Sequence, residues 1–500
     1  MHSEVIIIGG GLGGLSAGAY LAQNNIKVTL IEEQPHVGGY VVAFKRDQFI
    51  FDVALHAIPG CAPAQPFHNL LNELKIAGKL KFIKLQNAFN VNLGNYNFLI
   101  PNSFSEFFYK LELEFPEEKS GLIRLKTYIS NYGKLYYDVV EGHSDTTKIL
   151  TKFIPKITDF LKKSYISTDA FLSGFIKDRR LKSVLYQAAI FFGEPMDEFP
   201  AINFIIMFYL LFNSGMYTIR GGGQVLTNEL ESKMRNHGAK IITNERVQSI
   251  QIRNKRAKAV TLKNGQELKC SIIISNINTP ELVHNLITPG KIPIHYIQAV
   301  DSMKPSLSIL QLHLGLDCNI EEIGIKHYLN VFFPDDDIDS AMHRQNNSEM
   351  IEGYSVIAPG INYSEDKSNV RRILSIVGGV SAERWIGLDA VNYKNQKKQI
   401  TRQIINILEN HYPGIIGHIK TIDLATPNTF RSYTKNPLGA ILGFKAERGR
   451  HRTLLKISKF PIKNIFLANA WTNRLGGFMQ TIQSGVVAAK NSVNYLDKLN

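Results

Sequence analysis

The chain has 500 residues, 44% of them hydrophobic, and a formal net charge of +14. This length exceeds what one simple hydrophobic core supports, so we expect two domains. The three cysteines, Cys61, Cys270 and Cys318, are scattered and odd in number. That pattern excludes a disulfide framework and a cysteine-based metal cluster, and it indicates a reducing compartment.

The positive charge does not indicate nucleic-acid binding, because the chain contains no helix-turn-helix, zinc-finger or RNP-like pattern. A lysine-rich solvated surface and attraction to an anionic membrane both account for it. The longest strongly apolar run, Phe204 to Phe212, has about half the length that a bilayer-spanning helix needs. Met1 leads directly into the first predicted strand, so we expect no signal peptide. We therefore expect a cytoplasmic protein, with peripheral contact at the inner face of a membrane as a further hypothesis.

A glycine-rich turn follows the first predicted strand, the apolar run Val5 to Ile8. Gly9, Gly11 and Gly14 satisfy the pattern G-x-G-x-x-G. In a dinucleotide-binding turn the first glycine permits the tight bend, the second lets the backbone approach a pyrophosphate, and the third lets a helix pack closely. The helix predicted over Leu15 to Gln23 would direct free N–H groups at the phosphates.

A second predicted strand, Lys27 to Ile31, ends at Glu32. A carboxylate there can accept hydrogen bonds from an adenosine ribose and disfavours a 2′-phosphate. The alternative is a glycine-rich turn that binds no nucleotide, but strand, turn, helix, strand and acid all occur in the required order. This spacing alone fits NAD as well as FAD. A second glycine pair, Gly38 and Gly39, follows just beyond the acid.

With this second pair, the stretch resembles the flavoprotein superfamily that contains amine oxidases, phytoene desaturases, carotenoid isomerases and retinol saturases. In that group the pattern marks FAD, so the resemblance implies FAD rather than NAD. It also implies an α/β fold: a three-layer, Rossmann-type FAD domain with a central parallel sheet, interleaved with an α+β substrate domain whose sheet is mostly antiparallel. Residues 51–60, FDVALHAIPG, resemble the family's FDxG-x-H stretch near the flavin. His56 matches the histidine of retinol-saturase-like members; a hydrogen-bonded histidine at a strand end is the alternative.

From Cys61 to about Ser214 the dinucleotide pattern is absent. Basic residues are frequent after Thr151, and one predicted helical face carries Phe153, Ile154, Ile157, Phe160 and Leu161. Such a segment is typical of a helix at a membrane interface, and also of an ordinary surface helix that packs on the core. For Phe204 to Phe212 we favour a core helix over the mouth of an apolar tunnel.

A second cofactor segment is predicted to start at Met216. It contains a glycine turn at Gly221 to Gly223, a helix over Leu226 to Asn236, strands at Ile241 to Thr243 and Val247 to Ile252, a hairpin joining Ala259 to Leu262 with Glu267 to Cys270, and a strand at Ile272 to Ile274. The resemblance implies that the backbone of Val247 contacts the adenine and that Ser275 and Asn276 lie near the cofactor.

The segment from Thr279 to about Asp423 predicts a mostly antiparallel sheet. The expected elements are strands at Leu307 to Leu316, Tyr354 to Ile357 and Leu374 to Val377, a helix at Gln399 to Glu409, and a polar loop from Pro334 to Glu349. Three consecutive carboxylates, Asp335 to Asp337, lie in this loop. Consecutive residues rarely converge on one ion, so they indicate a solvated turn, and no metal site is predicted.

The end of the chain predicts a strand at Ile465 to Ala468 and a helix opened by Gly476 and Gly477. A glycine-opened helix directed at an isoalloxazine ring would stabilise the anionic reduced flavin. This stretch resembles the family's last motif, NLYLAGAWT-x-PGGG. Asn469 stands in place of the usual glycine, and Ala470 in place of an acid found in some relatives, so a weaker affinity for flavin is implied.

The predicted FAD domain combines residues 1–60, 215–290 and 425–500. The substrate domain combines 61–214 and 291–424, with membrane-facing helices around 151–212. The catalytic candidates are His56 and Trp471. The predicted cofactor-binding residues are Gly9, Gly11, Gly13, Gly14, Glu32, Gly38, Gly39, Val247, Ser275, Asn469, Ala470, Gly476, Gly477 and Phe478.

The resemblance implies an FAD-dependent oxidoreductase that desaturates, saturates or isomerises a hydrophobic polyene, isoprenoid or related lipid, with hydride transfer at flavin N5. An amine oxidase is the alternative, as is a flavin- or lipid-binding protein without catalysis. The expected partners are a hydrophobic small molecule and an anionic membrane surface, with no nucleic acid. The sequence identifies neither the substrate nor the electron partner.

Overall fold

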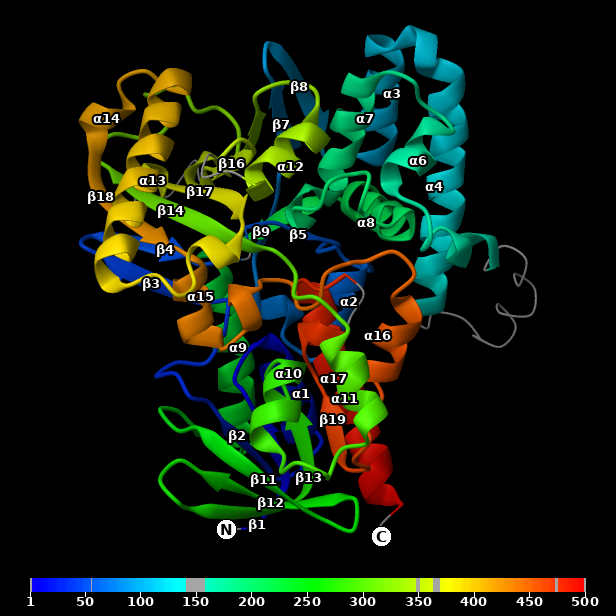
Figure 1. The fold of residues 1–500 in the computed structure, drawn as a ribbon, viewed down its shortest axis with the longest axis vertical. Helices are drawn as coiled ribbons and strands as arrows, with labels where there is room; N and C mark the ends of the chain where they lie inside the picture. Colours follow the sequence, from blue (N-terminus) through cyan, green and yellow to red (C-terminus); the bar gives the residue numbers. More distant parts are fainter. Residues whose placement is uncertain are drawn as a thin grey trace.

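The computed structural model describes residues 2–54, 56–140, 158–347, 351–362, 369–472 and 475–498. Two large sheets lie one above the other, and both chain ends lie beside the lower one (Figure 1). No helix in these ranges is both long enough and apolar enough to cross a membrane.

The first sheet is built from three distant parts of the chain. In spatial order its strands are β10 (Lys240–Ile242), β2 (Val28–Ile31), β1 (His2–Ile8), β13 (Glu267–Ser275), β12 (Arg256–Leu262) and β11 (Val247–Arg253), and β19 (Ile465–Leu467) also pairs with β13. The pairs β10–β2, β2–β1, β1–β13 and β13–β19 are parallel, whereas β11, β12 and β13 form antiparallel pairs. The predicted parallel core is therefore confirmed, and the last two predicted strands of the middle segment are one continuous strand, β13.

Packing on both faces of this sheet makes three layers. Val5 and Ile7 of β1 lie in one core cluster, whereas Ile6 and Ile8 lie in another, as alternation along a strand requires. On the first face α1 (Leu12–Gln23) packs against α9 (Gly223–Asn236) and α17 (Phe478–Asp497). On the other face lie η4 (Leu282–Leu286), α11 (Ile294–Asp301) and α16 (His451–Ile457).

The second sheet is antiparallel except at one pair. Its order is β18 (Ile419–Ala425), β14 (Ser308–Leu316), β17 (Ile373–Val380), β16 (Tyr354–Ile357), β15 (Leu329–Phe333), β7 (Asn87–Leu93) and β8 (Tyr96–Pro101), and only β15 and β7 run parallel. On one face of β14, Leu310, Leu312 and Leu314 pack with residues of α13 (Ala390–His411). The predicted mostly antiparallel sheet is confirmed, and the strands β7 and β8 were not predicted.

Helices from residues 61–214 lie along one side of the second sheet (Figure 1). They are α3 (Phe104–Glu114), α4 (Lys119–Val140), α6 (Thr168–Ser173), α7 (Arg179–Tyr186) and α8 (Ala201–Ser214), and α2 (Pro66–Glu73) precedes them. Smaller sheets are formed by β3 (Ala43–Arg46) with β4 (Phe49–Asp52), and by β5 (Ile58–Pro59), β9 (Met216–Ile219) and β6 (Phe82–Lys84).

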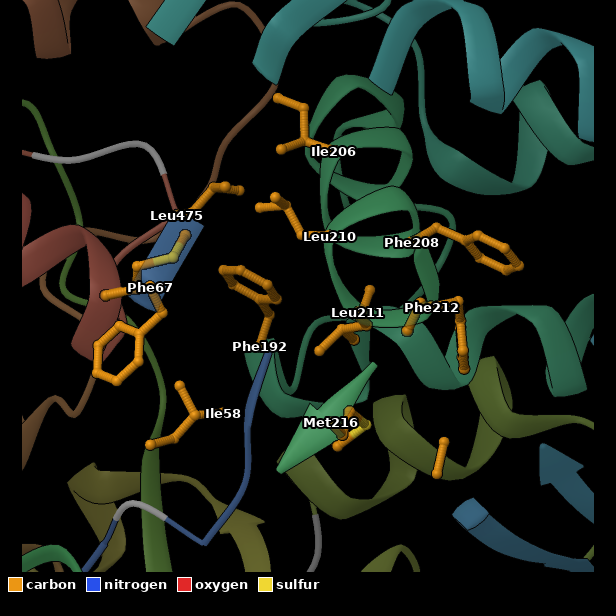
Figure 2. Packing of buried hydrophobic residues seen from close by; sticks show 14 of the residues in the cluster. Ile58, Phe67, Phe192, Ile206, Phe208, Leu210, Leu211, Phe212, Met216 and Leu475 are labelled. Carbon is orange, nitrogen blue, oxygen red and sulfur yellow. The ribbon is translucent and has the colours of Figure 1, made fainter. Parts of the chain in front are cut away.

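The prediction of membrane-facing helices is wrong for α8. Most side chains of this helix are buried within the protein, including Phe204, Phe208 and Phe212. Figure 2 shows Phe208 and Leu210 on opposite sides of the helix. The predicted face at Phe153, Ile154 and Ile157 lies outside the described residues; Phe160 is buried and Leu161 is exposed.

The predicted polar loop from Pro334 to Glu349 contains a helix, α12 (Ile338–Asn347). Asp337 is the N-cap of this helix: its carboxylate accepts hydrogen bonds from the backbone N–H and the hydroxyl of Ser340. Arg179 lies 3.0 Å from the same carboxylate. The prediction missed the helix because most of its residues are polar, and capping rather than apolar periodicity defines where it begins.

Candidate functional site

One continuous cavity of about 1230 Å³ is lined by residues of both sheets. Pockets for one small molecule typically measure roughly 300–1,000 Å³. This cavity therefore exceeds the usual size of a pocket for one small molecule.

The glycine turn and the second glycine pair meet at one end of the cavity. Gly11 forms a bridge with Gly38, and the N–H of Gly38 donates to the carbonyl of Gly10 at 2.7 Å. A Cβ atom on Gly11 would lie 2.6 Å from Oδ1 of Asn276. Four glycines line the cavity here, namely Gly9, Gly11, Gly38 and Gly39. Because they carry no side chains, a pyrophosphate can approach the backbone closely.

Three of the predicted cofactor residues do not line the cavity. A Cβ atom on Gly13 would lie 1.9 Å from the carbonyl oxygen of Ala468, and one on Gly14 would lie 2.1 Å from that of Gly9. Ser275 is fully buried within β13. These residues allow close packing around the site, and we propose no direct cofactor contact for them.

Glu32 is held by two backbone donors. Its Oε2 accepts from the N–H of Gly10 at 2.6 Å and its Oε1 from the N–H of Gln34 at 2.7 Å. Burial raises the pKa of Glu32, and the hydrogen bonds from Gln34 and Gly10 oppose that rise. Glu32 and Val247 both line the cavity.

The N-terminus of α17 faces the same cavity. Gly476 and Gly477 have φ angles of +56° and +78°, and the helix begins at Phe478. A left-handed backbone of this kind favours glycine. These three residues line the cavity together with Ala470 and Trp471. The arrangement supplies backbone donors and a positive helix end, which suits an anionic flavin ring.

Asn469, which stands in place of the family's glycine, has a structural role that the sequence did not predict. Its Nδ2 donates to the carbonyl of Ile277 at 2.8 Å, and its Oδ1 accepts from the N–H of Trp471 at 3.1 Å. The side chain thereby ties the turn after β13 to the turn after β19. It also lines the cavity, so the substitution is compatible with a cofactor site.

His56 lies beside two polar residues that the sequence prediction missed, Gln311 and His313 of β14. His56 Nε2 is 3.4 Å from Nε2 of Gln311, and Nδ1 of His313 is 2.9 Å from the hydroxyl of Ser375. The side chains of His56, Gln311 and His313 all line the cavity. Burial lowers the pKa of His56 to about 4, and burial with the nearby charges of His56 and Arg46 lowers that of His313 to about 3. Gln311 and His313 are polar residues two positions apart in an apolar strand, which is the signal that could have indicated them.

The far wall of the cavity is apolar. It includes Phe191 and Phe192 before α8, and Met207, Leu210 and Leu211 within α8. Figure 2 shows Phe192, Leu210 and Leu475 on the same side of α8. The preferred interpretation of α8 as a core helix is confirmed, and the same helix also forms a wall of the cavity.

One group of potential metal ligands, Asp317, Cys318 and His418, occurs among the described ranges. His418 and Lys420 each lie 2.8 Å from the carboxylate of Asp317. The ammonium of Lys420 already supplies the positive charge that this carboxylate attracts, so we assign no ion to the group.

The three-layer parallel sheet, with a glycine-opened helix at the cavity, defines a dinucleotide-binding protein of the α/β class. The chain belongs to the flavin containing amine oxidoreductase family, whose pattern matches residues 12–491. It is therefore an FAD-dependent oxidoreductase.

Two curated relatives and one solved structure show how widely this likeness extends. A chloroplastic prolycopene isomerase of Daucus carota is 26% identical over 454 residues, covering 87% of this chain and 71% of the relative. An all-trans-retinol 13,14-reductase of Danio rerio is 23% identical over 516 residues, covering 93% of this chain and 82% of the relative. The structure of a putrescine oxidase bound to putrescine matches with a TM-score of 0.66 at 14% identity, covering 99% of both chains, and shows the shared fold.

Proposed function

We propose that this protein oxidises, reduces or isomerises a hydrophobic polyene or related isoprenoid lipid. The observation that carries the proposal is the continuity of one cavity from the glycine turns to the apolar wall at α8. The names of the two relatives, a prolycopene isomerase and a retinol reductase, support a substrate of this class. Bound FAD would supply hydride transfer at its N5 atom.

We infer roles for the chain's own residues from their positions. Gly9, Gly11, Gly38 and Gly39 would admit the pyrophosphate, Glu32 would hold the ribose, and the backbone of Val247 would meet the adenine. Backbone donors at the start of α17, with Ala470 and Phe478, would hold the flavin ring. His56 and Trp471 are the proposed residues of the reaction region, because both line the cavity.

The division into two domains follows the same proposal. Residues 1–60, 215–290 and 425–500 would hold the cofactor. Residues 61–214 and 291–424 would enclose the substrate, because they supply α8 and the strands of the second sheet.

The test begins with the visible spectrum of the purified protein, before and after denaturation. We expect a flavin spectrum, and we expect unfolding to release the flavin into solution.

In the second experiment, the bound flavin is reduced anaerobically and mixed with a polyene. A polyene-dependent change in the flavin or polyene spectrum is expected. In a separate control, putrescine is added in air to the protein with its flavin oxidised. If putrescine reduces the flavin with release of hydrogen peroxide and polyenes have no effect, the protein is an amine oxidase. A protein that cannot be reconstituted with FAD would instead be a binding protein without this chemistry.

We further propose that an exposed surface around α16 contacts an anionic membrane. This α16 surface combines basic and apolar side chains, namely Leu161, Lys162, Tyr165, Arg448, Arg450, Arg452, Leu455 and Lys456, all exposed. The two segments that form it are joined, since the N–H of Gly449 donates to the carbonyl of Ser164 at 2.8 Å. The rings of Tyr165 and His451 are also in edge-to-face contact, with their centroids 5.4 Å apart. Basic residues beside exposed apolar ones suit an anionic lipid surface, such as the inner face of a membrane.

Flotation with vesicles tests this membrane contact. Binding to vesicles that contain phosphatidylserine is expected, with little binding to neutral phosphatidylcholine vesicles and a decrease at high salt. The double variant Tyr165→Asp, Leu455→Asp should lose binding. The control Ile416→Asp, which alters an exposed residue on α14 (Ile415–His418), should retain it. Equal binding of the double variant and the wild type would contradict the proposal.

A further inference from the structure

A polar cluster interrupts the cavity face of the second sheet. Ile309, Gln311 and His313 alternate along β14 toward the cavity, so two polar side chains share a face with an apolar one. Gln311 is 1% exposed and His313 is 2% exposed. His56 completes the cluster from the loop that precedes β5.

Gln311 has an incomplete set of hydrogen bonds. Its Nε2 lies 3.4 Å from Nε2 of His56, whereas its Oε1 has no hydrogen-bond partner within the described ranges of the chain. A buried carbonyl oxygen without a donor is costly, and most such atoms in proteins are paired. Gln311 lines the cavity, so a ligand that carries a hydrogen-bond donor can supply the missing bond.

The bond between Gln311 and His56 indicates which group of Gln311 remains available. If Gln311 donates through Nε2, then Nε2 of His56 accepts and Nδ1 carries the proton. Oε1 of Gln311 is then the acceptor that lacks a donor. A hydroxyl group on a ligand can supply that donor through its hydrogen without introducing a charge.

The cluster carries no charge that would favour an ionised ligand. Both imidazoles are neutral at pH 7, because their pKa values are lowered well below the usual one. The nearby Arg46 is paired with Asp423 through a 2.7 Å contact. A carboxylate would therefore lose its hydration without gaining an unpaired cation in this cluster.

We propose that Gln311, with His56 and His313, recognises a neutral hydroxyl group at one end of the substrate. The preferred substrate is accordingly a polyene alcohol rather than the corresponding hydrocarbon or carboxylic acid. This inference rests on the proposed polyene chemistry and adds the group by which the polyene is held. The apolar chain of the ligand lies along the wall formed by Phe192, Leu210 and Leu211.

Binding to the flavin-loaded protein tests the inference. The probes are all-trans-retinol, its methyl ether, which cannot donate a hydrogen bond, and all-trans-retinoic acid. Affinity is measured by quenching of tryptophan fluorescence, since Trp471 lines the cavity. The alcohol should bind about tenfold or more tightly than the ether or the acid, as a hydrogen bond to a buried unpaired group implies.

The variant Gln311→Met keeps a similar volume and removes the amide. In this variant the affinities for the alcohol and the ether should lie within about threefold of each other, mainly because the alcohol binds more weakly. The control Ser355→Ala, which alters another polar residue lining the cavity on β16, should retain the alcohol preference.

The outcomes separate the two proposals. Equal binding of alcohol and ether by the wild-type protein, or tighter binding of the acid, would overturn hydroxyl recognition and leave the polyene proposal standing. An unchanged preference in Gln311→Met would also overturn it. Failure of all three probes to bind the flavin-loaded protein would overturn hydroxyl recognition, and the anaerobic test with other polyenes would then decide the polyene proposal. The wild-type comparison needs no variant, so it remains decisive even if Gln311→Met does not fold.

Discussion

At the scale of single residues, glycines in the first turn serve two different purposes. Gly11 lies at the cavity, whereas Gly13 and Gly14 let α1 approach its neighbours. The pattern G-x-G-x-x-G does not distinguish these uses. Substitutions at the two kinds of position should therefore affect cofactor affinity and folding differently.

The variant Gly11→Ala should fold and bind FAD at least about tenfold more weakly. The added methyl would lie 2.6 Å from Oδ1 of Asn276, whose amide is held by a hydrogen bond to the carbonyl of Ala468. The measurement is flavin content after dialysis, together with titration of the apoprotein. Gly78→Ala, with no heavy atom within 4 Å of the new methyl, is the control. Wild-type flavin content in Gly11→Ala would show that the pyrophosphate lies elsewhere.

His313 should make stability depend on pH. Its pKa is lowered from 6.5 to about 3 by burial, with contributions from His56 and Arg46. As pH falls from 6.5 toward 3, the unfolded chain binds a proton that the native protein does not. Native stability should then fall by up to about 1.4 kcal/mol per pH unit from this group.

The variant His313→Gln isolates that effect. Other groups titrate in both proteins, so the difference between the two curves of unfolding free energy against pH reports on His313. Urea unfolding between pH 7 and pH 4 should give a shallower decline for the variant. Parallel curves would mean that the His313 ring is protonated in the native state without cost.

At the scale of elements, the cofactor site depends on the contact between α1 and α17. A Cβ atom on Gly485 would lie 2.1 Å from the hydroxyl of Ser16 and 2.2 Å from the carbonyl of Gly13. The two helices approach closely there, and the hydroxyl of Ser16 on α1 donates to the carbonyl of Ile482 on α17 at 3.1 Å. This contact sets the position of the α17 N-terminus relative to the first glycine turn.

The variant Gly485→Ala should separate these helices and destabilise the protein by about 1–3 kcal/mol, the usual cost of overpacking. Flavin affinity should fall as well, because both helix N-termini face the cofactor cavity. Denaturant unfolding and flavin titration are the measurements. Gly417→Ala in α14, where a new methyl meets no heavy atom within 4 Å, should change neither quantity much. Full stability in Gly485→Ala would indicate that the helices can move apart at no cost.

At the scale of the whole molecule, the first sheet joins strands from the beginning, middle and end of the chain. Residues from all three parts line the cofactor cavity. A bound dinucleotide would therefore hold these segments together, so cofactor binding and global folding should be coupled.

Free FAD at one hundred times its dissociation constant should raise the unfolding free energy of the apoprotein by about 2.7 kcal/mol. Thermal unfolding followed by circular dichroism should show a midpoint that rises with FAD concentration and coincides with release of flavin fluorescence. Riboflavin, which lacks the pyrophosphate and adenosine, should raise the midpoint less at equal concentration. Release of flavin well before the loss of secondary structure would argue against this coupling.

Local patterns in the sequence were enough to predict several strands. The apolar run before Gly9, the run from Lys27 to Ile31 and the alternation along β14 predicted strands that the structure contains. The family resemblance correctly implied FAD, the parallel sheet and the second antiparallel sheet. Such patterns are readable because periodicity and turn chemistry depend on residues only a few positions apart.

The set of side chains that share the cavity depends on how distant segments pack. The folded protein defines features that no local pattern predicted. It placed Gly13 against Ala468, a residue far along the chain, and buried Ser275 away from the cavity. It also brought His56 to Gln311 and used α8 both as core and as cavity wall. These outcomes depend on contacts between distant segments, which are set by the packing of whole layers and leave no local pattern in the sequence.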